Sequence, residues 1–181
     1  MTSKKLTPEN FLERDERMDC WSVYGIGAYS HPNEEWVRLV LEVSLSDELP
    51  DEILEMFDRA RATMVYGCFY YPLFTNGMEE IYRIKEAALK EACREGNASR
   101  ATIGKGYKSL IDWAHSQGFI ADDDLVRWHA GRSLRNAVSH KDKAMLLGPN
   151  DALRTLDISK ELIEKLFCAV RGKRQPTDAS V

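Results

Sequence analysis

The most distinctive stretch of the chain reads SLRNAVSHKDK, from Ser133 to Lys143. It places an arginine, an amide, hydroxyls, an imidazole and two lysines within about three helical turns, with apolar residues between them at helical spacing. A helix with one apolar face and one face of proton-transfer and phosphate-binding groups suits a nucleolytic site. An ordinary solvated helix face also carries such residues, so the rest of the sequence has to support the functional interpretation.

The composition is that of a soluble globular domain. The chain has 181 residues, of which 44% are hydrophobic and 30% charged, enough for one domain with an ordinary core. No signal-peptide pattern is present at the start, and the most apolar run, Met64 to Phe74, is too short to span a bilayer. We therefore expect a cytoplasmic protein. The four cysteines show no CxxC spacing and are expected to be buried thiols.

The charge distribution favours a local basic site over a broad one. The formal net charge of −4 argues against nonspecific coating of nucleic acid. Between Arg132 and Lys143, however, four basic residues face a single acid, Asp142.

The periodicity predicts an all-α antiparallel bundle. Residues 1–18 are expected to form a loose arm, 19–172 a single helical domain and 173–181 a disordered tail. No alternating strand of useful length is found. The expected helices cover approximately residues 33–43, 50–71, 72–96, 102–115, 122–145, 151–156 and 159–170.

A helical wheel divides the segment Asp122–Met145 into two sides. The side expected to face the core carries Val126, Ala130, Leu134, Ala137, Val138, Ala144 and Met145. The polar side carries Arg132, Arg135, Asn136, Ser139, His140 and Lys143, together with Leu125 and Trp128. Because tryptophan and arginine are enriched at interface centres, this side is expected to meet another subunit, with Leu125, Trp128 and Ser139 in the contact.

The residue types suit cleavage of RNA by its own 2′-hydroxyl. His140 can exchange a proton near neutral pH, and Arg135 can stabilise charge on the phosphate oxygens. Asn136 can orient His140 or bind phosphate. The two catalytic candidates diverge by about 140° around the helix axis, so two facing copies of the helix would assemble them more easily than one. No metal or cofactor is called for, since the histidines form no close ligand pair and Asp122–Asp124 resembles helix capping.

The pattern Arg135-Asn136-x3-His140 resembles the Arg-x(4–6)-His signature of the HEPN superfamily (higher eukaryotes and prokaryotes nucleotide-binding domains). Leu134 before the arginine and the lysine after the histidine are similar to family usage. The segment Ile84–Leu89 resembles the long helix that precedes the motif. The likeness covers roughly two-thirds of the chain in pattern, and only the motif is specific.

The resemblance implies an all-α dimer whose paired motif helices form a composite cleft. It implies a metal-independent endoribonuclease that acts as a toxin, in toxin–antitoxin pairing, or in phage defence, with RNA as substrate and an antitoxin or defence protein as a possible partner. Arg135 and His140 would then be catalytic, and Asn136 would assist. Charge and proximity, separately from the family motif, assign RNA phosphate contacts to Arg132, Lys141 and Lys143.

Two other interpretations stay open at this point. One is a non-catalytic binding module whose polar helix face holds a nucleotide or a protein. The other is a helical scaffold with a coincidental motif. A structure that clusters the arginines and histidines at a two-fold axis would favour the nuclease.

Overall fold

A computed structural model of the chain describes residues 4–23, 27–28, 34–139 and 147–174. The N-terminal part holds a 3₁₀ helix, η1, Glu16–Cys20, and two short strands, β1, Ser22–Val23, and β2, Gly27–Ala28, which pair antiparallel. A second 3₁₀ helix, η2, Tyr66–Cys68, joins two of the long helices. The α-helices are α1, Glu34–Glu42; α2, Asp51–Val65; α3, Pro72–Glu95; α4, Arg100–Ile103; α5, Tyr107–Ser116; α6, Asp122–Ser139; and α7, Pro149–Arg174.

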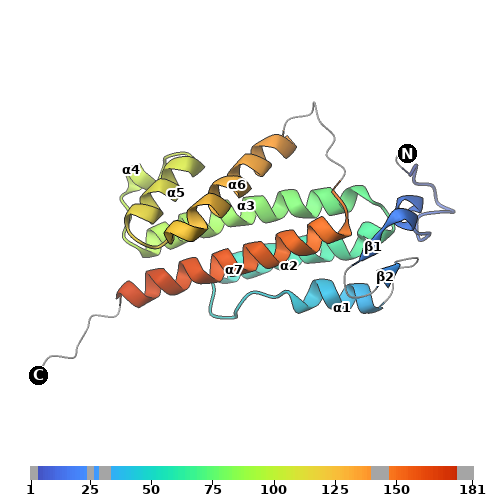
Figure 1. Cartoon of the computed structure of the whole chain (residues 1–181), viewed down its shortest axis with the longest axis horizontal. Helices are drawn as coiled ribbons and strands as arrows, with labels where there is room; N and C mark the ends of the chain where they lie inside the picture. The colour runs from blue at the N-terminus through green and yellow to red at the C-terminus, as the bar shows by residue number, and fades with distance from the viewer. Residues whose placement is uncertain (1–3, 24–26, 29–33, 140–146, 175–181) are drawn as a thin grey trace, which may run out of the picture.

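The expected all-α fold is confirmed, and its centre is α3. Helix α2 runs antiparallel to α3 and packs along it, while α7 packs on α3 and runs in the same direction as α3 (Figure 1). Helices α4, α5 and α6 gather at the other end of α3 from η1 and the strands. The core side of α3 includes Ile81, Ile84, Ala88, Leu89 and Ala92, all with no exposed surface.

Local signals set the ends of the long helices as the sequence predicts. Pro50 precedes α2, whose first turn carries Asp51 and Glu52, acids that suit the positive end of a helix dipole. Pro72 occupies the first position of α3, where its missing N–H is not needed. After α3, Asn97 adopts a φ of 62°, the left-handed conformation that ends helices.

Several expected helix boundaries are different in the structure. The expected helix 50–71 is α-helical only to Val65 and continues as η2. The segment 102–115 is not one helix, because Gly104-Lys105-Gly106 separates α4 from α5 and two glycines in three residues weaken a helix. Residues 151–156 and 159–170 belong to one helix, α7, in which Ser159 is buried instead of starting a new helix. Helix α7 also extends to Arg174, so the first two residues of the expected disordered tail are helical.

The expectation of a loose N-terminal arm is wrong for residues 15–18. The buried carboxylate of Asp15 accepts hydrogen bonds from the guanidinium of Arg17, at 2.6 Å, and from the backbone N–H of Tyr71, at 2.9 Å. Burial raises the pKa of Asp15, but these hydrogen bonds outweigh it and the net pKa lies below the usual value. Met18 is 1% exposed, so this segment is part of the core.

Two further observations concern the surface. Within the described part of the chain, no helix combines the length and the apolar character that a bilayer crossing requires. Cys68 and Cys93 are buried as expected, whereas Cys20 and Cys168 are exposed, so the prediction of buried thiols is wrong for those two.

Candidate functional site

Helix α6, which carries the motif arginine, faces the bundle with a different side from the one the wheel predicts. Trp128 is only 1% exposed, and Asp124 and Gly131 are also buried. Val126 is 74% exposed and Leu134 39% exposed, although both were expected in the core. The placement of Trp128 on an exposed, subunit-facing side is therefore wrong, because its indole packs inside this chain.

The buried side of α6 rests on a lysine of α3. The ammonium of Lys85, itself 2% exposed, lies 5.1 Å from the centre of the Trp128 ring, within range of a cation–π interaction. A Cβ at position 131 would lie 2.7 Å from the Lys85 nitrogen, so any larger residue there would require the Lys85 ammonium to shift. The wheel predicts an aliphatic contact between α6 and the core. The structure has Trp128 and Gly131 there instead, because they pack against the Lys85 ammonium.

A charged network joins the start of α6 to α7. Arg127 donates to the buried Asp124 at 2.8 Å and to Glu161 of α7 at 2.8 Å. Lys165 donates to Asp124 at 3.1 Å and lies 2.7 Å from Glu161. Hydrogen bonds from Arg127 and then Lys165 lower the pKa of Glu161 to about 2. Asp124 therefore takes part in an inter-helix network, beyond the capping role expected for it.

Arg135 is held by an acid of the central helix. Its guanidinium lies 3.2 Å from the carboxylate of Glu86 on α3, and Glu86 also accepts a hydrogen bond from Lys90 at 2.8 Å. The side chain of Arg135 keeps 41% of its surface exposed. Arg135 is thus paired with α3 while about two fifths of its side-chain surface stays exposed.

Arg132 and Asn136, the neighbours of Arg135 in the motif region, differ in exposure. Asn136 is exposed, whereas Arg132 is half-buried. Among the described residues, the buried Nε of Arg132 and the buried hydroxyl of Tyr107 on α5 have no hydrogen-bond partner. Burial, and then the charge of Glu86, raise the pKa of Tyr107. A phosphate contact of Arg132 would use its terminal nitrogens, since Nε faces the protein interior.

The remaining expected site residues are only partly described. His140, Lys141 and Lys143 lie outside the described residues, as do Ala144 and Met145. Ser139 is the last residue of α6. Leu125 is half-buried and packs against the core. The structure therefore brings Arg135, Arg132 and Asn136 to one end of α6 and leaves the distance from Arg135 to His140 untested.

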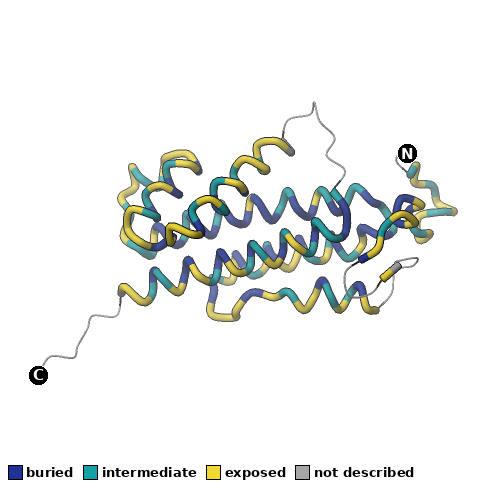
Figure 2. The backbone as a smooth tube through the Cα atoms, in the orientation of Figure 1, coloured by how far each residue is buried: buried dark blue, intermediate teal, exposed yellow. Residues whose placement is uncertain are grey.

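The exposed side of α6 carries an apolar stripe. We define the α6 stripe as Val126, Ala130, Leu134 and Ala137, which recur every three or four residues and are all exposed. Figure 2 shows this contrast, with α3 coloured mostly as buried or intermediate and α6 carrying many exposed residues. An apolar helix face that its own chain leaves uncovered is typical of a protein–protein contact.

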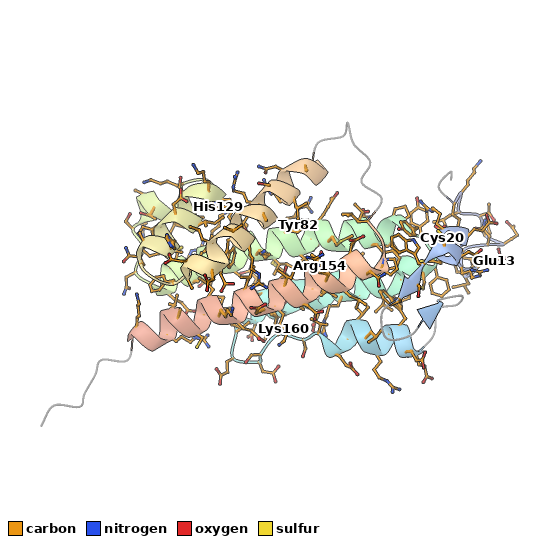
Figure 3. The ribbon with its side chains drawn as sticks, viewed as in Figure 1. Glu13, Cys20, Tyr82, His129, Arg154 and Lys160 are labelled. Atoms are coloured by element: carbon orange, nitrogen blue, oxygen red, sulfur yellow. The ribbon has the colours of Figure 1, made fainter. Side chains whose placement is uncertain are left out.

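The structure also reveals a pocket between α3, α6 and α7 that the sequence analysis did not find. It has a volume of about 380 Å³ and is bounded by Tyr82 and Lys85 of α3, Gly131 and Leu134 of α6, and Thr155 of α7, among others. Figure 3 labels two of the lining residues, Tyr82 on α3 and Arg154 on α7. A usable sequence signal existed, because Lys85 falls on the same helical line as Ile81, Ala88 and Ala92.

Comparison of the chain with models of protein families, with curated proteins and with solved structures gives no match in any of the three.

Proposed function

We propose that the protein is a metal-independent endoribonuclease of the HEPN type, active as a homodimer, which serves as a toxin or defence effector. The observation that carries the proposal is the Arg135-Asn136-x3-His140 motif, with Arg135 and Asn136 on the solvent-accessible end of α6 beside an uncovered apolar stripe. The motif supplies the chemistry, and the stripe supplies a surface for a second copy.

In the proposed reaction the 2′-hydroxyl of RNA attacks the adjacent phosphorus, and the bond from phosphorus to the 5′-oxygen breaks. His140 exchanges the proton that must leave the nucleophile or reach the leaving group. Arg135 stabilises the negative charge that builds on the non-bridging oxygens. The products are a 2′,3′-cyclic phosphate and a 5′-hydroxyl, and no step requires a metal ion.

The ion pair with Glu86 supports a positioning role for this acid. A carboxylate 3.2 Å from the guanidinium limits the conformations of a long side chain that is otherwise 41% exposed. A fixed guanidinium loses less entropy when it binds a phosphate, which favours catalysis by preorganisation.

The α6 stripe supports the homodimer. If two copies bury their stripes against each other, the two motif regions are brought together at the contact, as a composite site requires. This arrangement replaces the interface expected around Trp128, since that ring is already buried within one chain.

Cleavage of a fluorescent single-stranded RNA in excess EDTA tests the enzyme. We expect cleavage with a 2′,3′-cyclic phosphate end, and a loss of at least 100-fold in Arg135→Ala and His140→Ala. Arg83→Ala is the matched control, because Arg83 is an exposed arginine on α3 that pairs only with Glu80 among the described residues. Cleavage that survives both motif substitutions would overturn the proposal.

A second candidate, a non-catalytic nucleotide- or protein-binding module, is favoured by one observation. Glu86 already pairs with Arg135, so an incoming phosphate must compete with a carboxylate for the same guanidinium. This candidate predicts RNA or nucleotide binding that Arg135→Ala weakens, with no product detectable after prolonged incubation.

A further inference from the structure

The wall of the pocket between α3, α6 and α7 carries a buried cation that pairs with no acid among the described residues. The Lys85 ammonium lies in its wall, next to Gly131 and over the face of Trp128. Within the described ranges, Lys85 makes no ion pair and no hydrogen bond is found for its nitrogen. Buried charges in proteins are normally paired, because their desolvation is expensive. An unpaired ammonium that is 2% exposed is therefore an unusual feature of this core.

The other charged groups at the pocket do not neutralise Lys85. Arg127, from α6, is a second cation, and it is engaged by Asp124 and Glu161. Arg154, from α7, is exposed at the pocket surface. Asp151, the acid that α7 contributes, accepts a hydrogen bond from the backbone N–H of Gly148 at 2.9 Å. Of the cations that line the pocket, Lys85 is therefore the buried one that no described acid pairs with, which suits a ligand with one negative group.

The remaining walls define the rest of the ligand. Apolar side chains contribute from all three helices and the segment before α7, namely Met78, Leu134, Leu147 and Ile158. Hydroxyl groups line the α3 and α7 walls, namely those of Tyr82, Thr155 and Ser159. A volume of about 380 Å³ lies within the range of small-molecule sites. Such a lining accommodates a hydrocarbon body, with one polar end directed to the buried ammonium.

We propose that this pocket is a binding site for a small organic monocarboxylate, whose carboxylate pairs with the Lys85 ammonium and whose hydrocarbon part occupies the apolar walls. A charge-assisted hydrogen bond between ammonium and carboxylate in a desolvated site is among the stronger polar contacts in proteins. The site uses none of Arg135, Asn136 and His140, so the proposed binding does not depend on ribonuclease activity. Its Leu134 wall also belongs to the α6 stripe.

The state of Lys85 before binding is consistent with this assignment. Burial, and then the nearby charge of Arg127, lower the pKa of Lys85 to about 8. A bound carboxylate opposes both effects and raises the pKa again. Binding measured near pH 8.5 should therefore be accompanied by proton uptake, because the anion draws a partly neutral amine back to its charged form.

Calorimetric titration of the full-length protein with octanoate tests the site. We expect saturable binding with one site per chain at pH 7, and binding at least tenfold weaker for octanol, which has the same chain length and no charge. Inorganic phosphate, which lacks the hydrocarbon part, should also bind at least tenfold more weakly. Equal binding of octanol and octanoate, or no octanoate binding, would overturn the proposal.

Two variants connect binding to the residue. Lys85→Met removes the ammonium and keeps the length of the side chain, and it should weaken octanoate binding at least tenfold. Lys108→Met, an exposed lysine on α5, is the matched control and should bind like the unmodified chain. Unchanged affinity in Lys85→Met would overturn the proposal.

If Lys85→Met does not fold, as judged by circular dichroism, the decisive measurement uses the unmodified chain. Titrations at pH 8.5 in two buffers of different ionisation enthalpy give the number of protons exchanged on binding. Uptake of a fraction of a proton supports pairing with Lys85, and no uptake overturns it.

Discussion

The guanidinium of Arg135 on α6 lies 3.2 Å from the carboxylate of Glu86 on α3. This ion pair joins the motif helix to the central helix of the bundle, at a side chain that remains 41% exposed. The same carboxylate accepts a hydrogen bond from Lys90, one helical turn further along α3. The position of the motif arginine is thus set by a helix about fifty residues earlier in the chain.

A double-mutant cycle measures the strength of this pair. With Arg135→Met and Glu86→Gln, we expect a coupling of about 0.2–1 kcal/mol in the free energy of unfolding, because one partner is substantially solvated. The coupling should decrease in 1 M salt. The control cycle pairs Arg135→Met with Glu91→Gln, since Glu91 binds Arg94 instead. A coupling of equal size in both cycles would mean that the Arg135–Glu86 contact is not specific.

The α6 stripe leads to a prediction about assembly. Val126→Glu and Leu134→Glu should each shift the protein from dimer to monomer, because a charge in an apolar contact must be desolvated. Sedimentation velocity measures the shift, and unchanged circular dichroism shows that the bundle persists. Leu12→Glu is the control, as Leu12 is 67% exposed and lies in the N-terminal segment. A dimer that tolerates both stripe substitutions would place the subunit contact elsewhere.

Gly131 leads to a prediction that depends on the background. In the unmodified chain the new Cβ of Gly131→Ala must displace the Lys85 ammonium from the face of Trp128, so the substitution should be less favourable for stability than it is in the absence of that lysine. In a Lys85→Ala background the space is free, and the same substitution should stabilise by up to about 1 kcal/mol. Urea denaturation of the four proteins gives both values. The same change in both backgrounds would disprove the steric coupling.

Removal of the Tyr107 hydroxyl should change the free energy of unfolding little. Because this buried group has no hydrogen-bond partner among the described residues, Tyr107→Phe should leave the free energy of unfolding within about 0.5 kcal/mol of the unmodified value, or raise it. Leu110→Ala, a fully buried neighbour on α5, should cost about 2–5 kcal/mol in the same assay. A loss above 1 kcal/mol in Tyr107→Phe would reveal a partner for the hydroxyl.

The features that the sequence predicts well are those with local causes. Pro72 and Asn97 mark the ends of α3 through their own backbone preferences, whatever packs around them. The all-α class follows from the same source, since helical spacing of apolar residues runs through most of the chain. These signals need no knowledge of which helices meet.

The orientation of α6 could not be predicted in this way. The wheel assigns the most aliphatic face to the core, and on α6 that face is the exposed stripe containing Val126 and Leu134. The face that packs against α3 carries Trp128, which lies beside Lys85, and Arg135, which pairs with Glu86. Recognising this requires knowing that two charged residues lie opposite α6, which is tertiary information. The Arg135 side of the candidate site was foreseen, but its carboxylate partner was not.

Lys85 provides the last prediction, on the pH dependence of stability. Its pKa in the folded chain is about 8, against an ordinary value of 10.5, because burial and then Arg127 disfavour the charged form. Below about pH 8 the amine is charged in both the folded and unfolded chains, and burial of this charge destabilises the folded chain. Between about pH 8 and 10.5 the folded chain releases this proton while the unfolded chain keeps it. The unfolded state then binds more protons, so the free energy of unfolding must rise with pH.

Urea denaturation at pH 7, 8, 9 and 10 measures this effect when the unmodified chain is compared with Lys85→Met. The stability of the unmodified chain relative to the variant should increase across this window, by an amount on the order of 3 kcal/mol at most. Lys108→Met should follow the unmodified chain at every pH, because its amine is exposed in both states. Saturating octanoate should reduce this rise of the relative stability with pH, since a bound carboxylate keeps Lys85 charged in the folded chain. A difference between the unmodified chain and Lys85→Met that does not change with pH would show that the Lys85 ammonium is already neutralised by another group of the protein.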